Sequence, residues 1–343
     1  MKLQKIYLKN YRNYDDILLE LNNNLNIIIG DNAQGKTNLL ESIYVLAVTK
    51  SFLSISDKNL INFNSRYSII KGIVDYNGSY DELELLINEN GKVVKINKKE
   101  IKKLSDYISK MNVILFSSDS IRIFKDSPSC RRKYFNIQIS QINKIYLANL
   151  NNYNLVLRQR NEFLKIININ KESDMNYLDI LNDKYIGLSI DIYNYRRKYV
   201  NLVNKYIGDI FYSITGLEGL KMVYTSNVSN LDNDMFKDKL KSNLSREIQY
   251  KMTFIGPNRD DFYFDLNGKN LSLYGSQGQI RSAVLALKLA EVKLFTDVLF
   301  DTPILLLDDI FSELDIENID KNVRNKANVY KIEDGNIISR EII

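Results

Sequence analysis

The chain has 343 residues, 45% of them hydrophobic, and a net charge of +5. It has no histidine, which excludes imidazole catalysis and histidine-ligated metals and leaves carboxylates, lysines, hydroxyls and bound magnesium for any chemistry. A single cysteine, Cys130, excludes an internal disulfide and suits the cytoplasm, and no run reaches the roughly 18 to 20 apolar residues of a membrane span. The modest positive charge is compatible with a polyanionic partner.

The N-terminal segment is predicted to form strands that lead through a glycine loop into a helix. Leu3, Ile6 and Leu8 alternate with polar residues, and residues 17–21 form a second strand. Residues 25–29 are a nearly continuous apolar run, which is typical of a buried parallel strand. Apolar residues at helical spacing follow the glycine loop, so the order is strand, loop, helix.

The middle of the chain changes from strands to helices. Apolar runs on both sides of Asn90-Gly91 predict an antiparallel hairpin between about 69 and 103. From about 130 to 250 the pattern is helical and predicts an inserted lobe, with interruptions near Asn168 and Gly216. The C-terminal third returns to a hairpin at Asn267-Gly268, a helix over 279–295 and an apolar strand over 304–307.

The glycine loop matches the pattern G-x-x-x-x-G-K-[ST] between residues 30 and 37. In such a loop, backbone N–H groups and the positive end of the following helix bind phosphates. Lys36 is expected to reach the β- and γ-phosphates, and Thr37 to offer its hydroxyl to Mg²⁺. The predicted ATP-binding residues are Gly30, Asp31, Asn32, Ala33, Gln34, Gly35, Lys36, Thr37 and Asn38.

Two carboxylates end the apolar strand over 304–307. Asp308 is the candidate metal ligand together with Thr37, and Asp309 stands where a carboxylate would polarise the attacking water. Because aspartate is one methylene shorter than glutamate, we expect slow hydrolysis. Asp309 and Lys36 are therefore the catalytic candidates. Without the glycine loop, the same two acids would be read as a solvated strand end.

A second phosphate site is predicted at the start of the helix near residue 279. Ser276, Gln277, Gly278 and Gln279 precede or open this helix, where a serine hydroxyl and backbone amides can bind an anion. Two phosphate sites so far apart in sequence suggest that two copies of the chain share one nucleotide. A plain capped helix is the alternative reading.

Together these motifs resemble the ABC ATPase head of the SMC and RecF kind. Three further stretches are similar to RecF itself: 8–14 to its opening strand, 256–261 to its Gly-Pro-His-Arg-Asp-Asp segment, and Pro128 with Arg131-Arg132 to the start of its arm. The resemblance implies an ATP-dependent dimer that binds DNA, acts with RecO and RecR to load RecA, and supports the SOS response to DNA damage. It also implies that Arg12 contacts the nucleotide.

The resemblance also implies the fold. We expect an α/β protein, an ABC-type P-loop ATPase head with a parallel core sheet, an antiparallel β patch and an inserted helical second lobe. The head would comprise residues 1–118 and 252–343, and the helical lobe residues 119–251. The chain departs from the family pattern in having Ala33, Leu53 and Asn258, and in its short segment after Asp315, where the switch residue of the family has no counterpart.

Cationic side chains are the candidates for contacts with DNA phosphates, and any of them could instead be part of a solvated face. The predicted set is Lys99, Lys102, Arg131 and Arg132, with Lys103, Lys133, Arg158, Arg196, Arg197 and Lys198 as further candidates. Other readings are a transporter nucleotide-binding subunit, an SMC-like tether, for which the insertion is too short, and a DNA-binding relative that no longer hydrolyses ATP.

Overall fold

The computed structural model describes residues 1–21, 25–53, 56–169, 175–308 and 327–342. The chain divides into two compact units. The first, called the head unit here, comprises Met1–Asp119 and Phe295–Ile343, and the second, the helical unit, comprises Ser120–Leu294. None of the helices in the described ranges is long and apolar enough to cross a membrane.

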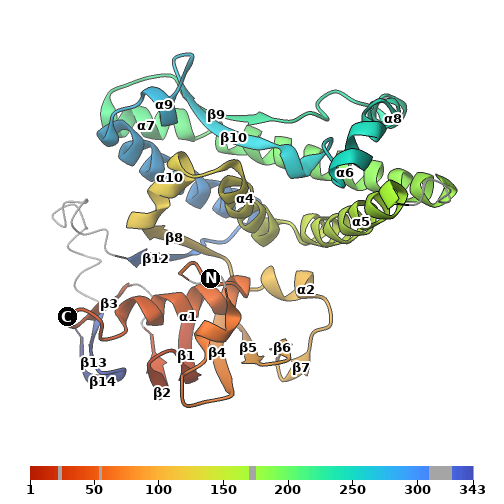
Figure 1. Ribbon diagram of the computed structural model, residues 1–343. Helices are drawn as coiled ribbons and strands as arrows, with labels where there is room; N and C mark the ends of the chain where they lie inside the picture. The colour runs from red at the N-terminus through yellow and green to blue at the C-terminus, as the bar shows by residue number, and fades with distance from the viewer. Residues whose placement is uncertain (22–24, 54–55, 170–174, 309–326, 343) are drawn as a thin grey trace. The chain divides into compact units, whose positions relative to one another are not determined.

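The head unit contains a six-stranded antiparallel sheet in the order β2-β1-β4-β5-β6-β7 (Figure 1). Alternate residues of its long strands are buried, such as Ile70 and Val74, because successive side chains of a strand point to opposite faces. The predicted hairpin at Asn90-Gly91 joins β5 to β6 and is confirmed. The strands are β1 (Lys2–Tyr11), β2 (Tyr14–Glu20), β4 (Tyr67–Tyr76), β5 (Ser79–Asn88), β6 (Gly91–Ile96) and β7 (Lys99–Glu100).

Parallel strand pairs form the rest of the head. Strand β3 (Leu25–Ile29) pairs with β13 (Ala327–Glu333), which continues through a hairpin into β14 (Asn336–Ile342). Strand β12 (Ile304–Asp308) pairs with β8 (Val113–Ser117). Helix α1 (Lys36–Val48) contacts strands of the antiparallel sheet and both β8 and β12. The predicted parallel strands are therefore present, in two separate small sheets over the described residues. The shorter helices are η1 (Asp57–Leu60), α2 (Leu104–Ile108) and η2 (Ser118–Ile121).

The helical unit is built around the antiparallel pair α5 and α6 (Figure 1). The predicted helical spacing is confirmed, since Tyr146, Leu150 and Tyr153 are all buried on one face of α5. With 26 residues, α5 is about 39 Å long at ~1.5 Å per residue, so the pair is no long coiled-coil arm. The helices are α3 (Arg122–Lys125), α4 (Pro128–Ile142), α5 (Lys144–Ile169), α6 (Met175–Val203), α7 (Ile207–Thr215) and α8 (Asn233–Tyr250).

The helical unit also contains a small antiparallel sheet, in the order β11-β10-β9. The sequence did not predict β9 (Leu220–Thr225), which lies inside the segment read as helical and pairs with β10 (Asp261–Leu266). These backbone hydrogen bonds hold residues 252–294 in the helical unit, whereas the sequence-based division returns to the head at residue 252. The remaining elements are η3 (Pro257–Arg259), β11 (Lys269–Asn270), α9 (Leu271–Tyr274) and α10 (Gln277–Leu299).

Candidate functional site

The glycine loop connects the buried strand β3 to the N-terminus of α1, as predicted. Gly30 and Gly35 have φ values of 153° and 112°, and Gly35 is the N-cap of the helix. A Cβ on Gly30 would lie 2.4 Å from the carbonyl oxygen of Ile332 in β13, so only glycine fits there. The loop is thus shaped both by its own glycines and by the strand that pairs with β3.

Lys36 folds back over the loop. Its Nζ donates to the carbonyl oxygens of Gly30 at 2.5 Å and Asp31 at 2.8 Å. The ammonium therefore lies above the loop at the N-terminal end of α1, where the helix dipole also favours an anion. Ala33 has a left-handed backbone although it is not a glycine: its φ is 68°, which lies in the region that favours glycine.

Thr37 and Asp308 meet although they are far apart in sequence. The Thr37 hydroxyl donates to Oδ1 of Asp308 at 3.1 Å, because the carboxyl end of β12 lies beside the first turn of α1. A hydroxyl and a carboxylate side by side are hard oxygen ligands, which suit Mg²⁺; this ion usually keeps several waters. The pair therefore fits the predicted metal site. Asp309, the predicted catalytic acid, lies outside the described residues.

Arg12, which the resemblance places near the nucleotide, is held by a carboxylate of α1. Its Nε and Nη2 donate to the two oxygens of Glu41 at 2.9 and 2.7 Å, and Tyr11 donates to the same group at 2.8 Å. Glu41 is fully buried and also accepts a hydrogen bond from Ser51. The hydrogen bonds to Glu41 raise the pKa of Arg12. The sequence reasoning missed Glu41, which fastens the β1–β2 turn to α1.

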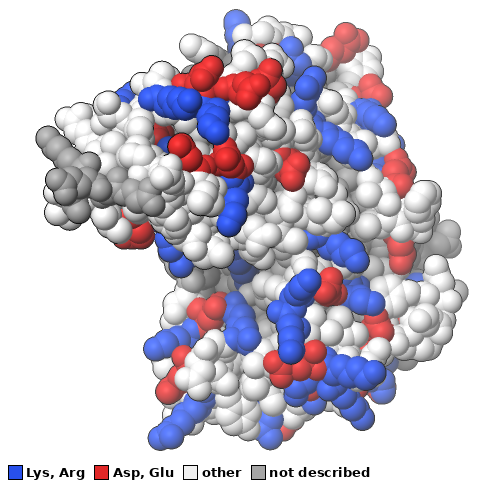
Figure 2. All heavy atoms as spheres, turned by 90° about the vertical axis from the view of Figure 1, so that its right-hand side faces the viewer, with Lys and Arg blue, Asp and Glu red and all other residues white. Residues whose placement is uncertain are grey.

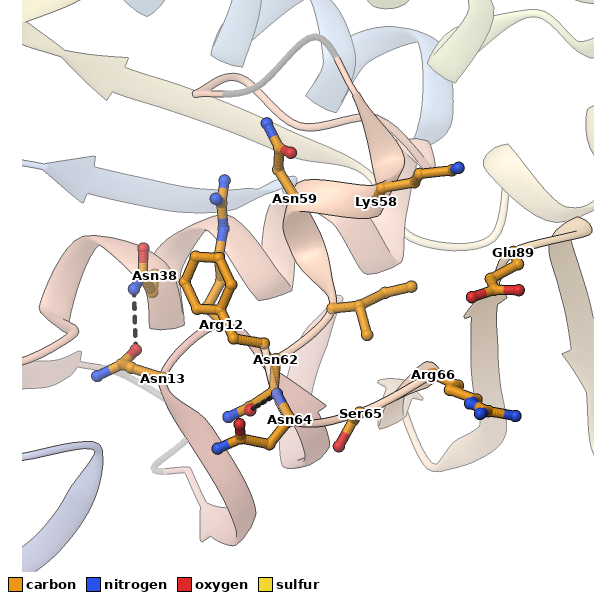
Figure 3. Close-up of a pocket in the computed structure, with 12 residues that line it drawn as sticks. Arg12, Asn13, Asn38, Lys58, Asn59, Asn62, Asn64, Ser65, Arg66 and Glu89 are labelled. Atoms are coloured by element: carbon orange, nitrogen blue, oxygen red, sulfur yellow. Dashed lines mark hydrogen bonds between the residues drawn. The ribbon is translucent and has the colours of Figure 1, made fainter.

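An open pocket of about 850 Å³ lies next to the first turn of α1. Asn13 and Asn38 line one side of it and Arg66 and Glu89 another, with Arg12 between them (Figure 3). The pocket is rich in asparagine, and fully exposed Phe63 contributes an aromatic ring. Arg12 and Asn38 were predicted to contact ATP, but most of the lining was not, because residues 58–66 contain no motif. The complete lining is Arg12, Asn13, Asn38, Lys58, Asn59, Ile61, Asn62, Phe63, Asn64, Ser65, Arg66 and Glu89.

The predicted second phosphate site lies at the N-terminus of α10 in the helical unit. Gln279 N donates to the Ser276 hydroxyl at 3.2 Å, and Ser276 N donates to the Gln279 side chain at 3.0 Å. These two reciprocal hydrogen bonds form a capping box, so Ser276 caps helix α10. Ser276, Gln277 and Gly278 are exposed, and first-turn amides have no acceptor within their own helix. The turn can therefore cap its helix and still meet an anion.

The predicted DNA-binding cations differ in their surroundings. Lys99, Lys102 and Lys103 are exposed around β7 and the start of α2. Figure 2 shows many lysine and arginine side chains on one face of the protein, with acidic side chains among them. Arg131, by contrast, donates to both oxygens of Asp261 at 2.7 Å, and Arg132 donates to the Asp260 carbonyl at 2.7 Å.

One further candidate is ruled out as a surface contact. Arg196 is only 2% exposed and donates to Oδ2 of Asp260 at 2.7 Å, so the prediction that it binds DNA is wrong.

The loop on a parallel strand, the acid at the end of a second parallel strand and the capped serine turn are typical of an ABC-type P-loop ATPase. Comparison with known proteins narrows this class. The family model described as "RecF/RecN/SMC N terminal domain" matches residues 2–326.

Two relatives are DNA replication and repair proteins RecF. The one from Geobacillus sp. (strain WCH70) is 37% identical over 98% of both chains, and that from Staphylococcus aureus (strain JH9) is 36% identical over 98% of this chain and 100% of the relative. The solved structures of the recombination mediator protein RecF with ATP and with ATPrS, in the RecFOR pathway, have TM-scores of 0.92 and 0.90 at 30% identity. They cover 99% and 98% of this chain, and 97% and 98% of their own chains. The chain belongs to the RecF family.

Proposed function

We propose that this protein is an ATP-binding factor of DNA replication and repair that acts in the RecFOR pathway, in the cytoplasm. The observation that carries the proposal is the hydrogen bond between Thr37 and Asp308, which joins the end of the phosphate loop to the acid at the end of β12. The relatives' names and the ATP-bound structure among them support the same function. RecO and RecR are the expected protein partners.

In this proposal different residues of the head unit bind different parts of Mg²⁺-ATP. Backbone N–H groups of residues 30–37 bind the phosphates, and Lys36 leaves its two carbonyl partners to bind the β- and γ-phosphates. Thr37 and Asp308 hold Mg²⁺, which neutralises phosphate charge when bound. The pocket beside Asn13 and Asn38 receives the base and ribose, where Phe63 offers a stacking surface.

The helical unit completes the site in a second copy of the chain. Ser276 is exposed at the N-terminus of the 23-residue helix α10, where its hydroxyl and the amides of Gln277 and Gly278 are open to a phosphate. Two copies arranged head to tail would clamp one nucleotide between the loop of one and the serine turn of the other. ATP then becomes part of the dimer interface.

DNA is the partner of the ATP-bound dimer in this proposal. The exposed Lys99, Lys102 and Lys103 are the better candidates, because their ammonium groups lie on the surface. The guanidinium groups of Arg131 and Arg132 already have acceptors within the protein. Contacts to phosphates alone predict binding that ignores sequence and weakens steeply with salt. An affinity for duplex or gapped DNA that does not change between 50 and 200 mM salt would contradict it.

A variant of the same function is ATP binding with little or no hydrolysis. The match to the Geobacillus relative extends over 368 positions, more than the 343 residues of this chain, so the relative has residues that this chain lacks. This agrees with the short segment after Asp315. We expect slow or absent ATP turnover by the purified protein. Rapid turnover that is abolished by Lys36→Ala would exclude the variant.

The experiment that tests the proposal is light scattering of the purified protein with and without Mg²⁺-ATP. We expect monomers without nucleotide and dimers with it, and no dimers for Ser276→Arg, which places a bulky side chain in the shared site. Ser272→Arg, on the same unit but outside the turn, is the matched control and should still dimerise. A wild-type protein that binds no ATP would refute the proposed function, and one that binds ATP but remains monomeric would refute the shared site.

A further inference from the structure

Two carbonyl groups of the phosphate loop, those of Gln34 and Gly35, are held by residues outside the loop. The Gln34 carbonyl accepts hydrogen bonds from Nδ2 of Asn13 at 3.0 Å and from the Gly335 N–H at 3.3 Å. The next carbonyl, that of Gly35, accepts from the Tyr14 hydroxyl at 3.0 Å and from Leu39 N at 2.9 Å, the first hydrogen bond within α1. Asn13 and Tyr14 are adjacent residues of the β1–β2 turn and start of β2.

These contacts fix the direction of two N–H groups. In a trans peptide the carbonyl of one residue and the N–H of the next point in opposite directions, and the described chain has no cis peptide bond. Since Asn13 and Tyr14 draw the carbonyls of Gln34 and Gly35 to their own side, the N–H groups of Gly35 and Lys36 point to the other side. Those are N–H groups of the loop's phosphate-binding face.

The β1–β2 turn lies in direct contact with the phosphate loop. A Cβ on Gly35 would lie 2.5 Å from Nδ2 of Asn13 and 2.9 Å from the Tyr14 hydroxyl. On the other side, a Cβ on Gly335 would lie 2.2 Å from the Asn13 carbonyl oxygen. Asn38, in the first turn of α1, donates to Oδ1 of Asn13 at 2.8 Å, which fixes the orientation of that amide (Figure 3).

We propose that Asn13 and Tyr14 are positioning residues of the nucleotide site: they orient the peptide groups 34–35 and 35–36 so that two N–H groups face the phosphates. They act on the phosphates through the backbone and touch no phosphate themselves, although Asn13 also lines the pocket beside the first turn of α1. The inference rests on the proposed binding of ATP to this loop and specifies which residues outside the loop determine its affinity. Both contributors are neutral, so they hold the loop without adding charge to a polyphosphate site.

The test measures Mg²⁺-ATP affinity by titration calorimetry for Asn13→Ala, Asn13→Asp and Tyr14→Phe. Asn13→Ala and Tyr14→Phe each remove one donor and should weaken ATP binding about tenfold. Asn13→Asp keeps the acceptor for Asn38 but sets a carboxylate against the Gln34 carbonyl, so it should bind ATP the most weakly. Matched controls are Asn90→Ala, in the exposed β5–β6 turn, and Tyr76→Phe, whose hydroxyl donates to the Lys110 carbonyl elsewhere in the head.

A pH profile separates positioning from a general loss of structure. An aspartate titrates near ~3.9, so lowering the pH from 7.5 to about 4 protonates roughly half of the N13D carboxyl groups, and the protonated carboxyl can donate to the Gln34 carbonyl as the amide does. The ratio of wild-type to N13D affinity should therefore shrink as pH falls. Melting temperatures without nucleotide should fall no further in the three variants than in the controls. A purely structural role would leave the ratio constant with pH.

The outcomes distinguish this inference from the proposed function. If the wild-type protein does not bind ATP at all, the proposed function fails. If it binds ATP and the affinities of all three variants stay within about twofold of wild type, the positioning role is refuted while ATP binding stands. A loss of affinity in N13D that does not recover at low pH would also overturn the role of the Asn13 donor.

Discussion

The two units of the molecule hold their polar groups in different ways. Among the described residues of the helical unit, three cation–carboxylate pairs have both side chains at most 2% exposed, namely Arg160–Glu247, Arg196–Asp260 and Lys288–Glu291. In the head unit, the phosphate loop is fastened by the neutral groups of Asn13 and Tyr14 and by backbone N–H groups. The head's own pair, Arg12–Glu41, leaves its arginine 20% exposed.

This difference follows from what each region has to bind. A loop that binds a polyphosphate gains from dipoles that point at the ligand, and a fixed carboxylate beside it would oppose binding. The helices of the second unit carry no such constraint, and two of the three buried pairs connect elements. Arg160 on α5, for example, contacts α6, α8 and Thr253. A buried pair contributes little net stability, but breaking it leaves an unpaired charge in the interior.

The largest effect is expected from Glu247→Gln. This change removes the charge opposite Arg160, which is fully buried, and leaves the guanidinium without a counter-ion. We expect a loss of about 3 to 5 kcal/mol in the free energy of unfolding of the helical unit, measured by urea denaturation. The matched change in the head, Glu41→Gln, should cost only about 1 to 2 kcal/mol, because water reaches Arg12.

A double replacement sharpens this comparison. Arg160→Met together with Glu247→Leu removes both charges and should restore most of the lost stability, as is usual when a buried pair becomes apolar. Equal losses for Glu247→Gln and Glu41→Gln would mean that exposure of the arginine does not set the cost. In that case the proposed contrast between the two units would be incorrect.

A smaller effect, visible only as a pH dependence, is expected from Lys288. Burial lowers the pKa of this lysine to about 8, while a lysine in the unfolded chain titrates near ~10.4. Between these values the unfolded chain binds more protons, so this group makes stability rise with pH, by roughly 1 kcal/mol per unit at most. Lys288→Met should remove the rise between pH 8 and 9.5, measured by thermal unfolding.

Neighbouring groups do not reverse this expectation. Burial raises the pKa of Glu291, so the contribution of this carboxyl to the free energy of unfolding decreases as pH rises. Removal of the Lys288 cation raises the pKa of Glu291 further. The slope of the variant is therefore lower than that of the wild type on both counts. Burial also raises the pKa of Tyr199, which keeps it outside the window, and Tyr134 joins the cluster by donating to Glu291 at 2.5 Å. Identical slopes for the variant and the wild type would show that folding does not lower the pKa of Lys288.

The sequence predicted those features that depend on local pattern. The strand, glycine loop and helix around Lys36 follow from residues that are adjacent in the chain. The antiparallel hairpin at Asn90-Gly91 was predictable for the same reason. The Thr37–Asp308 pair follows because an apolar strand that ends in a carboxylate is expected to bring that acid beside a phosphate loop. The capping box at Ser276 was left open as an alternative, and its geometry is now confirmed.

What could not be predicted depends on partners that are distant in sequence. Nothing near Arg131 indicates that Asp261 neutralises it, and nothing near Arg196 indicates that Asp260 does. Strand β9 is six residues long and lies between helices, so its pairing with β10 determines its conformation more than its own sequence does. Glu41 was missed because a single acid in a helix gives no periodic signal.

The smallest effect is expected from a change at Ala33. This change tests whether the hydrogen bonds from Asn13 and Tyr14 are enough to fix the conformation of the phosphate loop. Its left-handed φ of 68° costs an alanine roughly 1 to 2 kcal/mol, and glycine would avoid that cost but lose about 0.5 to 1 kcal/mol through greater flexibility of the unfolded chain. Ala33→Gly should therefore raise the free energy of unfolding by at most about 1.5 kcal/mol. ATP affinity should change by less than about twofold, because Asn13 and Tyr14 still hold the carbonyls of Gln34 and Gly35. An affinity loss of about tenfold would mean that the Ala33 methyl restricts the loop as strongly as those hydrogen bonds do.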